Sequence, residues 1–158
     1  MTDTISLTNQ IPHRIDIHHH VVPVEYVKAL KGIGTTTAGD ISFPNWSQNQ
    51  SLEIMDQNGI ASAITSISSP GVYFGNPSFA RELARRCNEF SASLAQSNPD
   101  RFGFFATLPL PDTEGAMAEA VYALDTLAAD GVALLASNGN KYLGHPDFNE
   151  LMGELNRR

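Results

Sequence analysis

Arg14-Ile15-Asp16-Ile17-His18-His19-His20 is the stretch of sequence that decides the fold. Apolar and polar residues alternate along this short extended run. Side chains at alternate positions of a strand share a face. Ile15 and Ile17 are therefore expected to point one way, toward covering helices. The opposite face is expected to carry three polar side chains, Asp16, His18 and His20. Such a polar face fits a strand whose carboxyl end looks into a functional site.

The histidines of this run predict a metal site. His18 and His20 lie two residues apart on the polar face, so that one nitrogen of each ring can reach the same ion. On a helix, the same spacing would place the two rings on different faces. His19 has the opposite parity and is not expected to bind this ion, whereas Asp16 is expected to orient a ligand histidine. The competing interpretation is a solvated histidine-rich tract, and two ligands alone fall short of the usual three or four.

Further along the chain, strand patterns alternate with helix patterns. The later strands are expected over residues 60–68, 102–108 and 132–136. Helices are expected over residues 24–31, 47–58, 77–97, from Asp112 or Thr113 to Gly131, and 146–156, with loops at 32–46 and 137–140. Four strand–helix units in succession predict an α/β fold with a parallel sheet under helical cover.

Two architectures fit this alternation of strands and helices: an open doubly wound sheet, or part of a (β/α)8 TIM barrel. A complete barrel needs about 250 residues, and this chain has 158. We therefore expect residues 13–158 to cover the first four βα units, a half barrel, after a tail over residues 1–12.

Composition excludes several classes of protein. Hydrophobic residues make up 42% and charged residues 17%, which is ordinary for a globular domain. The net charge of −7 and the lack of a basic cluster argue against nucleic acid as a partner. No apolar run approaches the length of a membrane-spanning helix. The single cysteine, Cys87, and a start without a secretory pattern predict a cytoplasmic protein.

Three other side chains are weaker candidates for site residues. Trp46 could line a substrate pocket, although a lone loop tryptophan more often covers the core. Cys87 lies on the apolar stripe of the helix over 77–97 and is expected to be a core residue. His145 precedes Pro146 and is expected to stand just before a helix.

The run over residues 16–20, followed by Val21-Val22-Pro23, resembles the first-strand metal motif of the amidohydrolase superfamily. The resemblance is to the branch around aminocarboxymuconate-semialdehyde decarboxylase and 6-methylsalicylate decarboxylase. It runs from about His13 to the last residue. Softer matches follow in order: Met55-Asp56-Gln57-Asn58-Gly59-Ile60, Arg101-Phe102-Gly103-Phe104, Thr107-Leu108-Pro109 and Tyr142-Leu143-Gly144-His145-Pro146.

This resemblance implies a (β/α)8 barrel with a divalent metal, commonly zinc, on His18 and His20. It implies a decarboxylase that removes a carboxylate from an aromatic or unsaturated acid, a small-molecule substrate. The later ligands of the family lie beyond Arg158, as would its acid–base group. An arginine that holds the substrate carboxylate is also expected, and Ser51 stands at the matching position.

Three hypotheses remain open. The first is the metal-dependent decarboxylase, and the second is a metal-dependent hydrolase of amides, esters or lactones on the same fold. The third is a truncated, catalytically inactive fragment. In a half barrel the edge strands are unpaired, so we also expect self-association or a homo-oligomer.

Overall fold

Four parallel strands form the main sheet of the protein. The computed structural model describes residues 13–158, and the predicted tail over 1–12 lies outside the described residues. The strands are β1 (Arg14–His20), β4 (Ile60–Ser66), β5 (Phe102–Thr107) and β6 (Gly131–Ala133). They lie side by side in the order β1-β4-β5-β6, the order in which the chain forms them. This is the order of a (β/α) barrel, so the half barrel is confirmed and the doubly wound alternative, whose strand order reverses, is wrong.

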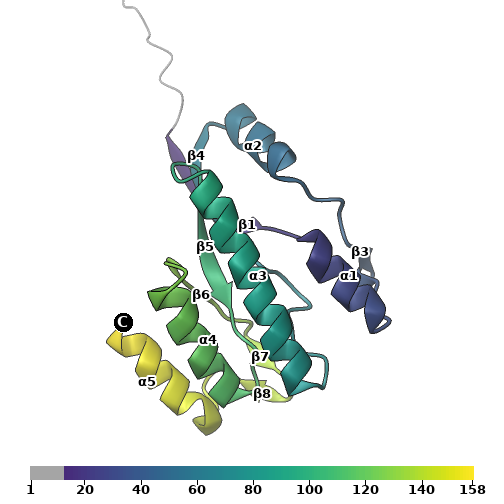
Figure 1. Ribbon diagram of the computed structural model, residues 1–158, viewed down its shortest axis with the longest axis vertical. Helices are drawn as coiled ribbons and strands as arrows, with labels where there is room; N and C mark the ends of the chain where they lie inside the picture. Colours follow the sequence, from purple (N-terminus) through teal and green to yellow (C-terminus); the bar gives the residue numbers. More distant parts are fainter. Residues whose placement is uncertain (1–12) are drawn as a thin grey trace, which may run out of the picture.

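Helices connect the strands, and α3 and α4 lie over one face of the sheet (Figure 1). The helices are α1 (Val24–Gly32), α2 (Gln48–Gln57), α3 (Pro77–Ser97), α4 (Thr113–Asp125) and α5 (Asn149–Arg157), with a 3₁₀ turn, η1 (Pro146–Phe148), before α5. The predicted loop over 32–46 contains one short hairpin, and a second hairpin begins in the predicted loop over 137–140 and ends at Tyr142. These are β2 (Thr37–Ala38) with β3 (Ile41–Ser42), and β7 (Ser137–Asn138) with β8 (Lys141–Tyr142).

The helix starts follow from side-chain caps. The Asn76 side chain accepts a hydrogen bond from Phe79 N–H at 3.1 Å at the start of α3, and Pro77 occupies the first turn. At the start of α4, Asp112 accepts from Gly115 N–H at 3.1 Å. These caps agree with the sequence prediction, because Asn and Asp satisfy backbone donors that the first turn leaves free.

The core lies between the sheet and its helices. Along β5, alternate residues Phe102, Phe104 and Ala106 are buried and face α3 and α4. Cys87 of α3 is only 2% exposed and packs in the same layer, which confirms it as a core residue. Among residues 13–158, no helix combines the length and apolar character that a membrane span requires.

The fourth unit differs from the prediction. Helix α4 ends at Asp125 rather than near Gly131, and β6 ends at Ala133 rather than at residue 136. The apolar residues Met117, Ala120, Val121, Leu124 and Leu127 follow a helical spacing that predicts one buried stripe, but Val121 is 38% exposed. The buried face is made of small residues and one carboxylate: Gly115, Ala116, Glu119, Ala120 and Ala123. This face of α4 is buried because it packs closely on α3 and because Arg85 pairs with Glu119.

Candidate functional site

A register shift in β1 sets the geometry of the histidine run. Asp16 pairs with Ala63 of β4, and the next paired residue, His19, pairs with Thr65. The chain thus takes three steps along β1 against two along β4, which is the signature of a β-bulge. Residues 16 and 19 consequently lie on the same side of the strand.

This bulge corrects the expected alternation. Ile15 and Ile17 are each 68% exposed and are not covered by helices, so the expectation that they face the helical layer is wrong. Asp16 instead turns toward that layer, where its Oδ2 lies 3.2 Å from Nδ1 of His19. Strict two-residue alternation failed because the bulge inserts one residue between these two positions.

His18 and His20 nevertheless come together at the carboxyl end of β1. Their ring centroids lie 4.8 Å apart with an interplanar angle of 77°. Nδ1 of His20 lies 3.2 Å from Oγ and 3.4 Å from the carbonyl oxygen of Ser66, at the end of β4. When Nδ1 is the protonated nitrogen in these contacts, Nε2 carries the free lone pair that a cation needs.

This pair of imidazoles fits a divalent metal as part of a ligand set. Imidazole nitrogen suits Zn²⁺ and other first-row divalent ions. Within the part of the chain that the structure describes, no group of three or more His, Cys, Asp or Glu side chains could hold an ion. His18 and His20 would therefore supply two ligands, and the remaining ligands would come from residues that the structure does not place beside them.

Asp16 supports the run through the backbone. Its Oδ1 accepts a hydrogen bond from the His18 backbone N–H at 3.0 Å, while its Oδ2 contacts the ring of His19 and neither ligand ring. Burial raises the pKa of Asp16, but the hydrogen bond from His18 and the contact with His19 outweigh it, and the net pKa lies below the ordinary value. Asp16 thus contacts His18 through the His18 backbone N–H and not through its ring.

The side chain of His19 points away from His18 and His20, into the helical layer. Its Nε2 lies 3.1 Å from Oγ of Ser51 on α2, and the indole Nε1–H of Trp46 donates to the same Oγ at 2.9 Å. Ser51 is 4% exposed. Sequence reasoning missed this chain of contacts, because nothing in the pattern of α2 marks Ser51 as a partner of β1.

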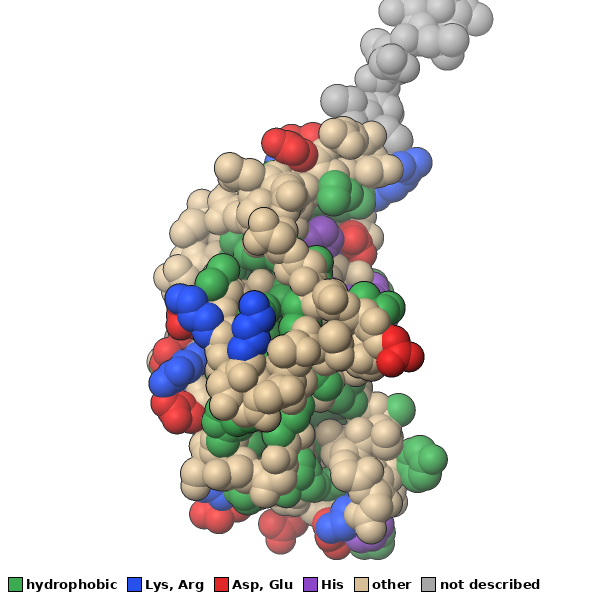
Figure 2. All heavy atoms as spheres, turned by 90° about the vertical axis from the view of Figure 1, so that its right-hand side faces the viewer, with side chains coloured by type: hydrophobic (Ala, Val, Ile, Leu, Met, Phe, Trp, Pro, Cys, Tyr) green, Lys and Arg blue, Asp and Glu red, His purple; other side chains and the backbone are tan. Residues whose placement is uncertain are grey.

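Trp46 lies apart from His18 and His20. Its ring meets that of Phe90 edge to face at 5.8 Å, and both line a groove of about 400 Å³ between α1 and α3. Hydrophobic side chains show in the hollows of the face that carries α1 (Figure 2). The structure does not bring Trp46 together with the histidine pair, and a substrate contact by Trp46 stays a prediction.

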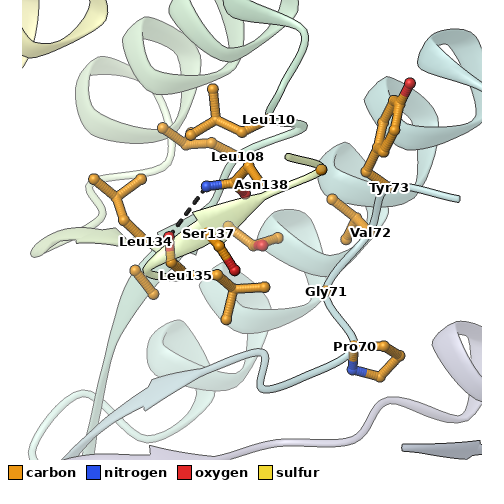
Figure 3. A pocket seen from close by; sticks show the side chains of 13 residues that line it. Pro70, Gly71, Val72, Tyr73, Leu108, Leu110, Leu134, Leu135, Ser137 and Asn138 are labelled. Atoms are coloured by element: carbon orange, nitrogen blue, oxygen red, sulfur yellow. Dashed lines mark hydrogen bonds between the residues drawn. The ribbon is translucent and has the colours of Figure 1, made fainter. Parts of the chain in front are cut away.

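A second hollow lies at the carboxyl ends of the strands, where barrel sites are built. It measures about 90 Å³. Val72, after β4, Leu108, after β5, and Leu135, after β6, all line it (Figure 3). Asn138 stiffens the rim, since its Nδ2 donates to the Leu135 carbonyl at 3.1 Å. The lining combines valine and leucine side chains with the polar residues Thr107, Ser137 and Asn138.

Comparison with known proteins agrees with this geometry. The sequence pattern described as amidohydrolase matches residues 15–157. The chain belongs to the amidohydrolase family. This amidohydrolase chain is 46% identical over 154 residues to the decarboxylase yanB of Aspergillus niger, covering 92% of this chain and 41% of that protein. It is 39% identical over 149 residues to the 6-methylsalicylic acid decarboxylase acuB of Aspergillus aculeatus, covering 92% and 45%.

Solved structures show the same family resemblance. A crystal structure described as an amidohydrolase II superimposes with a TM-score of 0.87 at 34% identity and covers 92% of this chain and 47% of that one. A 2,6-dihydroxybenzoate decarboxylase in complex with 2,6-dihydroxybenzoate gives a TM-score of 0.70 at 25% identity, covering 92% and 48%. The amidohydrolase chain therefore spans less than half the length of these relatives.

Proposed function

We propose that residues 13–158 form the N-terminal half of a metal-dependent decarboxylase that acts on an aromatic or unsaturated carboxylic acid. The observation that carries this proposal is the juxtaposed His18 and His20 pair at the carboxyl end of β1, with Nδ1 of His20 against Ser66. The relatives at 46% and 39% identity that are named decarboxylases support the reaction. No contact among residues 13–158 favours the hydrolase alternative over decarboxylation.

In this proposal the residues of the chain bind and orient. His18 and His20 would hold the ion, Ser66 would fix the ring of His20, and Asp16 would fix the backbone of His18. A bound divalent ion supplies positive charge that aligns a carboxylate or hydroxyl and stabilises developing negative charge. The hollow beyond β4, β5 and β6, lined by both leucine and polar side chains, would accept part of the substrate.

For the metal we propose Zn²⁺, with Mn²⁺ as the competing ion. A dihydroxybenzoic acid decarboxylase from Polaromonas, with a TM-score of 0.72 and 23% identity, carries bound manganese and the inhibitor 2-nitroresorcinol. At that identity the likeness concerns the fold. The case for metal on this chain therefore rests on its own imidazole pair, whose nitrogen donors suit zinc.

Calorimetric titration of the chain with Zn²⁺ and, separately, with Mn²⁺ tests the metal site. Weak binding to the wild-type chain is expected, and it should be lost in His18→Ala and in His20→Ala. His13→Ala is the matched control, because His13 is exposed and stands before β1 at the opposite end of the strand. Binding that survives both ligand substitutions, or falls equally in the control, would contradict the assignment.

A chimera tests the reaction. Residues 13–158 would replace the corresponding segment of the 6-methylsalicylic acid decarboxylase of A. aculeatus, and carbon dioxide release from 6-methylsalicylic acid would be measured beside hydrolysis of aryl esters and lactones. Metal-dependent carbon dioxide release supports the decarboxylase. Hydrolysis without carbon dioxide would favour the alternative. We expect the chain by itself to be inactive, so steady turnover by residues 1–158 would show that these residues are sufficient for catalysis.

Self-association and a cytoplasmic location belong to the same proposal. Strands β1 and β6 are the two ends of the main sheet, and such edges can pair with another chain. Sedimentation velocity over a range of concentrations should show a dimer or larger species. A single monomeric boundary at high concentration would count against association through the sheet edges.

A further inference from the structure

We propose that three residues outside the ligand pair, His19, Ser51 and Trp46, act with Asp16 as a positioning device for the metal site. We call these four residues the β1 clamp. The inference rests on the proposed metal-binding function and goes beyond it, because it assigns roles to residues that bind neither metal nor substrate. It also gives a role at the site to His19, which the sequence analysis predicts not to bind the ion.

The order of donors in the β1 clamp follows from chemistry. An indole nitrogen can only donate, so Trp46 Nε1–H occupies a lone pair of Ser51 Oγ at 2.9 Å. The Ser51 hydroxyl then donates to His19 Nε2 at 3.1 Å. With Nε2 accepting, the proton of His19 lies on Nδ1 and is donated to Asp16 Oδ2 at 3.2 Å. Every donor in this assignment has an acceptor.

The last hydrogen bond of the β1 clamp lies at the bulge of β1. The second oxygen of Asp16 accepts the backbone N–H of His18 at 3.0 Å. This N–H lies inside the interval from Asp16 to His19 where the pairing of β1 with β4 is interrupted. A carboxylate thus takes the place of a sheet partner, and it is itself held by the ring of His19. The direction of His18 depends on this oxygen.

Burial makes the β1 clamp rigid. Ser51 is 4% exposed, and the side chains of His19 and Asp16 are 13% and 29% exposed. Buried polar groups that lose a partner cost free energy that water cannot restore. Both nitrogens of His19 are engaged, so His19 is unsuited to bind the metal. Ser51 is likewise engaged on both sides and is unsuited to hold a substrate carboxylate.

The decisive substitution is Ser51→Ala, with Ser91→Ala as the matched control. Ser91 is a buried serine of α3, 3% exposed, that lies outside the β1 clamp. Zn²⁺ alone is the probe, titrated calorimetrically at a temperature at which each variant is folded. We expect Ser51→Ala to bind Zn²⁺ about tenfold more weakly, the lower end of the effect of losing a residue that orients a ligand. The control should bind as the wild type does.

A second readout is independent of metal. Trp46 is the only tryptophan of the chain, so its indole ¹H–¹⁵N resonance is assigned without ambiguity. Without Ser51 Oγ, this resonance should move upfield and exchange faster with water. His19→Ala cuts the β1 clamp at another point and should also weaken Zn²⁺ binding about tenfold. Ser51→Thr keeps the hydroxyl and should restore most of the affinity.

The outcomes separate the two proposals. If the indole resonance moves in Ser51→Ala but Zn²⁺ binding is unchanged, the positioning role is wrong and the metal site stands. If the indole resonance does not move, the β1 clamp does not exist as described. If His18→Ala and His20→Ala bind Zn²⁺ as the wild type does, the metal site itself is wrong, whatever the indole reports. Weakening in Ser51→Ala and His19→Ala, with recovery in Ser51→Thr, supports the inference.

Discussion

The side-chain amide of Asn88 pairs with the backbone of Thr107 like a neighbouring strand. Thr107 N–H donates to Asn88 Oδ1 at 2.8 Å, and Asn88 Nδ2 donates to the Thr107 carbonyl at 3.0 Å. The same Nδ2 donates to Glu119 of α4 at 2.8 Å, and Arg85 donates to Glu119 at 2.9 Å. One buried polar group thus ties α3 and α4 to the carboxyl end of β5.

Replacing Asn88 by alanine should destabilise the protein by about 2–4 kcal/mol, because buried groups of Thr107 and Glu119 lose their partners together. Urea unfolding followed by circular dichroism measures the change. Ser91→Ala, also buried on α3, should cost clearly less. A change below about 1 kcal/mol in Asn88→Ala would show that water replaces the amide at this strand end.

Gly103 of β5 is a second sensitive position. A β-carbon there would overlap the carboxylate of Asp130 and come within 2.7 Å of Ile64 Cδ1. Asp130 cannot retreat without loss, since it accepts a hydrogen bond from Phe104 N–H at 2.9 Å. Gly103→Ala should therefore lower the free energy of unfolding by about 1–3 kcal/mol.

Gly144 provides the matched control for this measurement. Nothing lies within 4 Å of a β-carbon built at Gly144, so Gly144→Ala should change stability by no more than about 0.5 kcal/mol. Equal effects of the two substitutions in thermal unfolding would show that the overlap at Gly103 is relieved by movement of the strand.

Cys87 should be inert in the folded protein. The thiol is 2% exposed, and burial raises its pKa to about 12. At about pH 8 the reactive thiolate is therefore scarce in the folded state and becomes accessible on unfolding. We expect negligible reaction with Ellman's reagent in buffer and one thiol per chain in concentrated urea. Rapid stoichiometric labelling of the folded chain would place Cys87 outside the core.

Asp112 should make stability depend on acid pH. Its hydrogen bond with Arg81, the largest effect, lowers the pKa of Asp112 below the ordinary value of 3.8, and its bond from Gly115 N–H acts in the same direction. A lowered folded-state pKa gives stability that is present above the unfolded pKa and is lost as pH falls through the folded one.

Asp112→Asn keeps a cap on α4 but removes the charge, so it isolates this effect. The variant should lose less stability than the wild type as the pH is lowered from about 5 to 2, measured by urea unfolding at each pH. Parallel curves for the two proteins would show that the Arg81 contact does not persist in solution.

Local signals in the sequence explain why so much of the fold was predictable. Asn76 with Pro77 marks the start of α3, and Asp112 marks that of α4. Helix α2 ends at Gln57, close to the end of its predicted range over 47–58, and Gly59 follows with a φ of 63°. Each feature is set by a few adjacent residues, so that tertiary contacts did not need to be known.

The features that the sequence analysis did not predict depend on partners that are distant in the sequence. The inward turn of Glu119 depends on Arg85 and Asn88 of another helix. The bulge in β1 depends on how Asp16 and His19 meet β4 and Ser51. The histidine pair was predicted correctly as neighbours, although by an alternation that the strand does not keep. Residue identity along one segment cannot specify such contacts, because the partners lie tens of residues away.

The extra residue in β1 also gives this strand one position that could be deleted without turning its neighbours over. Asp16 and His19 lie on the same side across the bulge, so removing Ile17 would leave them two residues apart in a regular strand and still on one side, with His18 and His20 together on the other. A deletion at a regular position of β1 would instead reverse one end of the strand against the other.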